Sequence, residues 1–218
     1  MSAPSVAVDI VLRPAARADL DAIARIMNEP PEPPSAVLMG ARPASRLGTL
    51  FVRAGISITL PQTTVATLDG RVAGVMECGR QDPSKLTPAR ALRLVPVAMR
   101  GVAIVGVTRV PRVLRGFYRR SRVSFDRVPD AFPIAELYVD EGVRNRGIGG
   151  RLLAHAEELA RSRGMRRLCL ETGIGNPARR LYERNGYRVV AAKTDAVYER
   201  LTGSPGRVLM IKELDAGD

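Results

Sequence analysis

The stretch that decides the fold is IAELYVDEGVRNRGIGG, which occupies residues 134–150. Residues 134–139 are mostly apolar and predict a short strand. Residues 149–163 predict the helix that follows, ended by Gly164. Its apolar stripe consists of Leu152, Leu153, Ala156, Leu159 and Ala160. Glycines at such a strand-to-helix junction let backbone amides converge on an anion, and the helix macrodipole adds positive charge there. The stretch therefore predicts a site for a pyrophosphate.

Two other phosphate-binding patterns compete for this junction. Residues 142–147 have the outline of a Walker loop, but Ile148 and Gly149 stand where Lys and Ser or Thr are needed. That excludes a nucleoside triphosphatase of this type. A dinucleotide fingerprint would need a small residue in place of Leu152 and glycines directly after the strand. Because Glu171 lies at the distance expected of a ribose-binding acid, this alternative is weakened but stays open.

The composition predicts a folded chain with a strongly basic segment. The 218 residues are 45% hydrophobic and 26% charged, with a net charge of +12. Residues 84–127 hold eleven Lys or Arg and one acid, Asp126, so ten of the excess positive charges lie there. Apolar residues at helical spacing, interrupted by Pro96 and Pro111, predict one or two amphipathic helices inserted between strands.

Two interpretations of the basic segment are open. Its Arg side chains can extend into water while the apolar faces pack on the domain. The sharper interpretation is a docking surface for cofactor phosphates, an acidic substrate, a membrane face or nucleic acid. The segment has only three aromatic residues, Phe117, Tyr118 and Phe125, which disfavours nucleic acid.

Several observations concern compartment and metal chemistry. The apolar run at 95–107 is too short and too interrupted to span a bilayer, and the first residues lack a signal-peptide pattern, so we expect a soluble cytoplasmic protein. Cys78 and Cys169 lie in apolar strand-like runs, which predicts two buried free thiols. His155 is the only histidine, which excludes a multi-histidine metal site, and we expect no metal.

The rest of the chain predicts one domain over residues 1–218 that mixes strands and helices. Asp69-Gly70 between two apolar runs is a strong hairpin signal. The expected strands are 6–12, 64–68, 72–78, 168–170, 187–191 and 207–214, and the expected helices are one around residues 20–27 and one at 177–184 with Asn176 as its N-cap. Residues 36–58 are ambiguous, with a helical hint near Leu47 and Leu50.

The sequence resembles the GCN5-related N-acetyltransferase (GNAT) superfamily. Arg144, Gly147 and Gly149 match its central motif, in which Gln or Arg is followed by two residues, Gly, one residue, and Gly or Ala. Residues 137–139 look like the family's splayed fourth strand. The segment 176–187, which reads NPARRLYERNGY, looks like its last conserved helix.

The resemblance covers about residues 135–190 well and is absent from about residues 84–127. It implies an α/β (α+β) fold with a mixed, mostly antiparallel central sheet flanked by helices, here with a basic helical insertion at about 84–127. It also implies transfer of an acetyl group from acetyl-coenzyme A to a primary amine by direct attack. By this resemblance the cofactor-binding residues are Leu137, Tyr138, Val139, Arg144, Asn145, Arg146, Gly147, Ile148, Gly149, Gly150, Asn176 and Tyr182.

The reaction needs a proton acceptor and a proton donor. The family's donor corresponds to Tyr182, which we expect to be the general acid. Glu136 shares a strand face with Tyr138 and is the expected base, while Glu77 is a second candidate. Some histone-modifying members carry their glutamate where this chain has Pro133, which leaves the base open.

Alternatives to this activity remain. They are a noncatalytic module that senses coenzyme A or binds anions, and acyl transfer to a non-amine nucleophile. The sequence does not identify the acceptor, which could be a small molecule or a peptide. The apolar face of the insertion could also form a homodimer contact.

Overall fold

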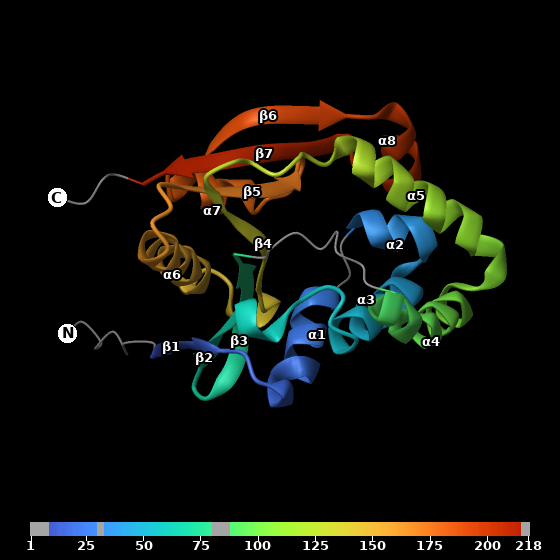
Figure 1. Cartoon of the computed structure of the whole chain (residues 1–218), viewed down its shortest axis with the longest axis horizontal. Coiled ribbons are helices and arrows are strands. Elements are labelled where there is room, and N and C mark those ends of the chain that lie inside the picture. The colour runs from blue at the N-terminus through green and yellow to red at the C-terminus, as the bar shows by residue number, and fades with distance from the viewer. Residues whose placement is uncertain (1–8, 30–32, 80–87, 215–218) are drawn as a thin grey trace, which may run out of the picture.

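A twisted seven-stranded sheet forms the centre of the protein, with helices on both of its faces (Figure 1). The structure is a computed structural model that describes residues 9–29, 33–79 and 88–214. The strands are β1 Ile10–Pro14, β2 Thr63–Leu68, β3 Arg71–Cys78, β4 Ala131–Val139, β5 Arg167–Gly173, β6 Arg188–Thr194 and β7 Gly206–Glu213. The helices are α1 Leu20–Asn28, α2 Pro33–Met39, α3 Ala41–Arg53, α4 Pro88–Val105, α5 Val110–Val123, α6 Ile148–Ser162, α7 Arg179–Arg184 and α8 Ala196–Thr202.

The strand order is β1-β2-β3-β4-β5-β7-β6, and every neighbouring pair is antiparallel except β4 and β5. This confirms the expected mixed, mostly antiparallel sheet. It rules out the dinucleotide-binding alternative, because that fold requires an open, mostly parallel sheet. The hairpin between β2 and β3 also forms as expected, with Asp69 at φ 50° and Gly70 at φ 76°.

The two parallel strands separate after four paired residues. Ala131 pairs with Arg167, and the pairing ends where Ile134 meets Leu170. Beyond that point β4 continues to Val139 beside β3 alone. The carboxyl-terminal half of β4 therefore has one edge that β5 does not cover.

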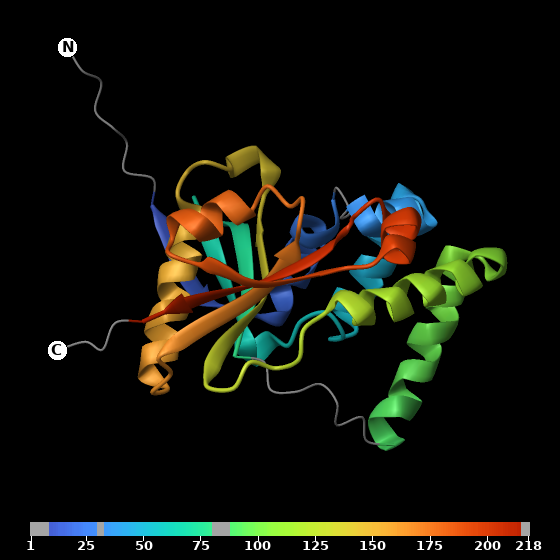
Figure 2. The same cartoon turned by 90° about the horizontal axis from the view of Figure 1, so that it is seen from above.

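Three groups of buried side chains hold the fold together. The largest lies between α6 and the sheet and includes Leu152, Leu153 and Leu168. The second lies on the opposite face under α1. The third joins α2, α3, α4, α5 and α8 into a helical cluster at the side of the molecule away from α6 (Figures 1 and 2). The basic insertion thus packs mainly on other helices and scarcely on the sheet.

Some expected boundaries are wrong. The first strand begins at Ile10, and the part of the prediction at residues 6–8 lies outside the described residues. Pro96 does not interrupt its helix, because α4 runs through it, whereas Pro111 sits in the first turn of α5, where a missing N–H costs nothing. The ambiguous 36–58 region forms most of α2 and all of α3.

Helix α8 was not expected from the sequence. Its signals are Asp195, whose side chain accepts a hydrogen bond from the Tyr198 amide at 2.6 Å, and Gly203, which ends the helix at φ 73°. Within the described residues no single helix is long and apolar enough to cross a membrane. Leu94–Val105 and Val107–Val123 meet that criterion only as a pair bent by 95°.

Candidate functional site

The junction between β4 and α6 has the backbone conformation of an anion-binding loop. After a short 3-10 helix, η4 (Glu141–Val143), the chain passes through two residues in the left-handed region, Asn145 at φ 64° and Gly147 at φ 81°. Such alternation makes successive amides point into one concavity. A Cβ at Gly147 would meet nothing within 4 Å, so glycine is needed here for its conformation and not for space.

The backbone amides of this loop lack acceptors in the part of the chain that the structure describes. The first helical hydrogen bond of α6 is donated by the Arg151 amide to the Gly147 carbonyl at 3.0 Å. Among the described residues, no hydrogen bond is found for the amides of residues 145–150. Residues 144–147 are exposed, and Arg146 adds positive charge to the loop, whereas Arg144 pairs with Glu141 at 2.9 Å. These amides are therefore available to an anionic ligand.

Contacts on both sides fix the loop in place. The Asp140 carboxylate accepts a hydrogen bond from the Gly142 amide at 3.0 Å and pairs with Arg25 of α1 at 2.7 Å. The Arg25 guanidinium is the main cause of a lowered pKa at Asp140. Helix α6 approaches the sheet closely at Gly74, where a Cβ would lie 2.9 Å from Ile148.

The uncovered edge of β4 begins beside this loop. The Asp140 amide donates to the Ala73 carbonyl, which places the backbone groups of Tyr138 on the β3 side. Because alternate residues of a strand direct their polar groups to opposite sides, the amides of Leu137 and Val139 face the gap between β4 and β5. This edge can pair with an extended ligand by hydrogen bonds.

The side chains of β4 face two different environments. Leu137 and Val139 pack with the α6 cluster, and Tyr138 packs with the α1 cluster. Glu136, half-buried, lies on the Tyr138 face directly across from Glu77 of β3. Glu77 is fully buried and accepts a hydrogen bond from the Thr59 amide at 2.7 Å. Of the two candidate bases, only Glu136 is open to solvent.

Tyr182 lies on α7 in the same buried cluster as Ile148, against which Leu137 and Val139 pack. It is only 6% exposed, and its ring meets that of Tyr187 edge-on at 6.1 Å. Helix α7 is held against the start of α6, since a Cβ at Gly149 would lie 2.7 Å from Leu181. Tyr182 and the side chains of Leu137 and Val139 therefore belong to, or pack against, the same buried cluster.

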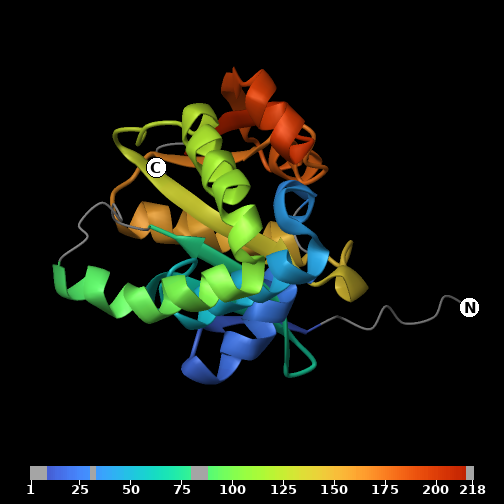
Figure 3. The same ribbon diagram turned by 90° about the vertical axis from the view of Figure 1, so that its right-hand side faces the viewer.

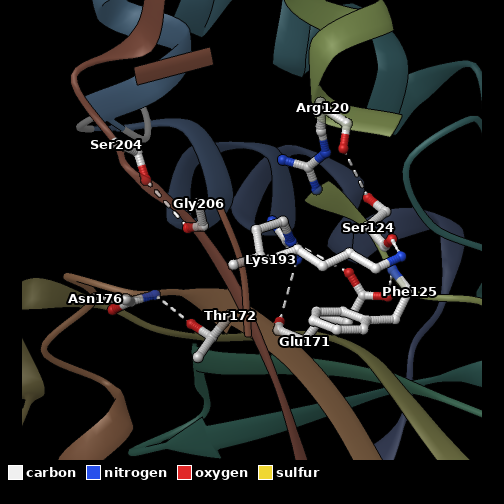
Figure 4. A network of polar contacts seen from close by, with 10 residues as sticks. Arg120, Ser124, Phe125, Glu171, Thr172, Asn176, Lys193, Ser204 and Gly206 are labelled. Atoms are coloured by element: carbon white, nitrogen blue, oxygen red, sulfur yellow. Dashed lines mark hydrogen bonds and ion pairs between the residues drawn. The ribbon is translucent and has the colours of Figure 1, made fainter. Parts of the chain in front are cut away.

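Asn176 lies three residues after the carboxyl end of β5. Its side-chain nitrogen, Nδ2, donates a hydrogen bond to Thr172 Oγ1 at 2.9 Å (Figure 4). Its side-chain oxygen, Oδ1, accepts one from the Ala178 backbone amide at 2.9 Å. Helix α7 begins at Arg179, so Asn176 caps the preceding turn and is not the helix N-cap that we expected.

A polar network ties the end of the basic insertion to the sheet (Figure 4). Glu171 accepts hydrogen bonds from the Phe125 amide at 3.0 Å and from Arg207 Nε at 3.2 Å. Lys193 donates to the Ser124 carbonyl at 2.7 Å and lies 4.9 Å from the Phe125 ring centroid. Both carboxylate oxygens of Glu171 are engaged by the protein, which gives it a structural role and not that of a ribose ligand.

The sequence did not reveal the supporting contacts of the site. Four residues that support the site by such contacts were not expected from the sequence: Arg25, Gly74, Thr172 and Leu181. Only Gly74 carried a signal, since glycine inside a predicted strand often marks the close approach of another element. The others act through contacts between elements that are distant in sequence.

Comparisons with known proteins bear on the family and the fold of the chain. Residues 97–189 match the sequence model of the acetyltransferase (GNAT) domain. The match therefore reaches into the 84–127 segment, where the sequence alone showed no resemblance. An uncharacterized N-acetyltransferase of Bacillus subtilis, YhfO, is 41% identical over 68 residues, which are 31% of this chain and 44% of that protein. The chain thus spans less than half the length of this curated relative.

Solved acetyltransferases share the fold. A histone acetyltransferase HPA2 and related acetyltransferase from Corynebacterium glutamicum superposes with a TM-score of 0.61 at 19% identity, covering 95% of this chain and 98% of that one. PaiA N-acetyltransferase of Thermoplasma acidophilum, solved with coenzyme A, superposes with a TM-score of 0.54 at 14% identity, covering 94% of this chain and 99% of that one. The chain has the fold of the GNAT superfamily and, over residues 97–189, its domain signature. The resemblance drawn from the sequence is confirmed.

Proposed function

We propose that this protein is an N-acetyltransferase that transfers the acetyl group of acetyl-coenzyme A to an amine. The observation that carries the proposal is the loop at residues 145–150, whose amides have no acceptor among the described residues and lie beside the uncovered edge of β4. A cosubstrate made of one nucleotide, with a diphosphate and an extended amide-bearing arm, fits this arrangement. The GNAT match supports the same ligand.

The residues around the loop fit such a cosubstrate in three respects. The amides of residues 145–150 would hold the diphosphate, assisted by Arg144 and Arg146. The Val139 amide, which lies nearer the loop, would bond the pantetheine arm in the manner of an added strand. Asn176 already uses its oxygen and one N–H within the protein, which leaves its second N–H for the ligand.

Acetyl-coenzyme A supplies an activated thioester, and the protein supplies position and proton transfer. The Leu137 amide also faces the gap, farther along β4 from the loop, and would polarise the thioester carbonyl by a hydrogen bond. Tyr182 would protonate the departing thiolate. A primary amine with a pKa near 10 is almost wholly protonated at neutral pH, so a base must accept its proton, and Glu136 is the accessible carboxylate on β4.

The test is release of free thiol from acetyl-coenzyme A in the presence of a panel of amines that includes polyamines, amino acids and peptides. We expect release that depends on both the protein and one class of amine. Binding of coenzyme A without turnover on any amine, alcohol or thiol would instead indicate a module that senses coenzyme A. Turnover on a non-amine acceptor would indicate a different acyltransferase.

The protein's own thiols do not disturb this assay. Cys78 and Cys169 are both free and buried, as the sequence predicts, and burial raises the pKa of each to about 11. A buried thiol of that pKa is almost entirely uncharged at pH 8, so we expect neither thiol to react with disulfide reagents in the folded protein.

A further inference from the structure

The outward faces of helices α4 and α5 are apolar. On α4, Val95, Met99 and Val102 follow each other at spacings of four and three residues, which places them on one face, and Met99 is 70% exposed. On α5, Leu114 and Tyr118 are one turn apart and are 62% and 60% exposed.

Each of these helices also has a second, buried apolar side that packs on the rest of the protein. The inward side of α5 contains Val113 and Gly116, and a Cβ at Gly116 would lie 2.7 Å from Leu38 of α2. The inward side of α4 contains Val105, which belongs to the helical cluster. Both helices are therefore already packed on one side, and their second apolar side has no partner in the described chain.

Basic side chains neighbour this second side, since Arg115 follows Leu114, Arg122 lies one turn after Tyr118, and Arg109 immediately precedes α5. Arg109, Arg115 and Arg122 are exposed, and no ion pair is found for them within the part of the chain that the structure describes. The sequence has no acidic residue from position 84 to position 125. Exposed apolar side chains flanked by uncompensated arginines are the pattern of helices that lie in the interface of a membrane.

We propose that the outward side of the α4–α5 pair docks on the surface of a bilayer that contains anionic phospholipids. The arginines would meet the headgroup phosphates, and Met99, Leu114 and Tyr118 would insert between the acyl chains. The two helices, bent by 95° relative to each other, form the outer side of the molecule opposite α6 (Figures 2 and 3). Docking there leaves the loop before α6 open. The proposal does not depend on the proposed activity.

Two other occupants fit the surface less well. A second copy of the chain would bring two unpaired basic rows together, which costs energy through repulsion of like charges. Nucleic acid would satisfy the arginines but would leave the exposed Met99 and Leu114 in contact with a charged backbone. An anionic bilayer satisfies the charges and the apolar side chains together.

The test is cosedimentation of the purified protein with vesicles of phosphatidylcholine alone and of phosphatidylcholine with one third phosphatidylglycerol. We expect binding to the anionic vesicles at least tenfold tighter than to the neutral ones, and weaker binding as salt is added. Failure to bind anionic vesicles, or equal binding to both kinds, would overturn the proposal even if no variant were made.

Matched variants locate the surface. The triple change Arg109→Glu, Arg115→Glu and Arg122→Glu should lower binding at least tenfold. The control changes Arg17→Glu, Arg71→Glu and Arg166→Glu alter the net charge equally at exposed positions outside α4 and α5. We expect the control to retain most of the binding, and an equal loss in both triples would contradict the location.

A second pair of variants tests insertion of the apolar face. Met99→Ser, Leu114→Ser and Tyr118→Ser together should lower vesicle binding at least tenfold, whereas Val11→Ser, Val189→Ser and Val190→Ser, exposed on edge strands, should not. Duplex DNA bound more tightly than the vesicles, or a dimer in light scattering that the first triple disrupts without any lipid binding, would assign the surface to another partner.

Discussion

The loop before α6 and the outward side of α4–α5 are both basic, yet they expose different groups. The loop presents backbone amides at positions that Asp140 and Gly147 fix within the fold. The helix pair presents side chains, long and apolar, with arginines at their border. Backbone amides held at fixed positions suit a small anionic ligand, whereas exposed side chains spread over two helices suit an extended surface. Positive charge alone therefore does not identify a ligand.

The largest expected effect is a loss of turnover on removing the hydroxyl of Tyr182, compared with removing that of the neighbouring Tyr187. Tyr182→Phe should lower kcat at least a hundredfold while leaving the affinity for coenzyme A within about twofold, because it removes the donor and keeps the ring. Steady-state kinetics and calorimetry measure the two quantities. Turnover equal to that of the unsubstituted protein would refute the role of Tyr182.

The matched control is Tyr187→Phe. The Tyr187 hydroxyl is buried and has no hydrogen-bond partner among the described residues, and burial raises the pKa of this tyrosine. Removing it should leave turnover unchanged and raise the free energy of unfolding by about 1 kcal/mol, because an unsatisfied buried hydroxyl is costly. A loss of turnover like that of Tyr182→Phe would show that the pair acts as a unit.

A smaller loss of activity is expected on replacing Glu136, the proposed general base. Glu136→Gln should lower kcat/KM for the amine about tenfold or more near neutral pH, and the deficit should shrink as the pH approaches the pKa of the amine, where free base is abundant. The pH profile is the measurement. Glu158→Gln, at an exposed position on α6, is the control. A deficit independent of pH would indicate positioning of substrate and not proton transfer.

The ion pair that holds the loop should contribute modestly to stability. The pKa of Asp140 is lowered in the folded state, so its contribution is present above the unfolded pKa near 4 and is lost as the pH falls through the folded value. Asp140→Asn should lower the free energy of unfolding by about 1 kcal/mol at pH 7, since Arg25 is half exposed. Denaturation at pH 7 and pH 3 measures this, and an equal difference at both would contradict it.

The smallest effect concerns the thiols. Neither Cys78 nor Cys169 should react with a disulfide reagent at pH 8 in the folded protein, and both should react after denaturation. Rapid reaction of either thiol without denaturation would show that the sheet opens more readily than its burial indicates.

Local signals in the sequence predicted one of the two regions better than the other. The hairpin at Asp69-Gly70, the helix after Gly147 and the closing strand near Met210 each depend on neighbouring residues, and all three form. The helical side depends on packing between distant segments. Pro96 was expected to interrupt a helix, yet α4 continues through it.

The geometry of the site was likewise only partly predictable. The motif located the loop and the open strand, because glycine spacing and strand alternation are local. It did not show that Glu77 is buried and bonded to the Thr59 amide or that Asn176 is bonded to Thr172, because those contacts arise from the tertiary fold. Such contacts decide which of several candidate residues can reach a ligand.

The central claim is that the loop before α6 binds the diphosphate of coenzyme A through its backbone, and calorimetric titration with coenzyme A tests it most directly. Gly147→Ala and Gly164→Ala place a methyl at positive φ, 81° and 69°, at opposite ends of α6, with nothing within 4 Å of either Cβ. Both should cost about 1 kcal/mol of stability. We predict that only Gly147→Ala lowers the affinity for coenzyme A, by at least tenfold. No binding by the unsubstituted protein, or equal affinity in the two variants, would contradict the account.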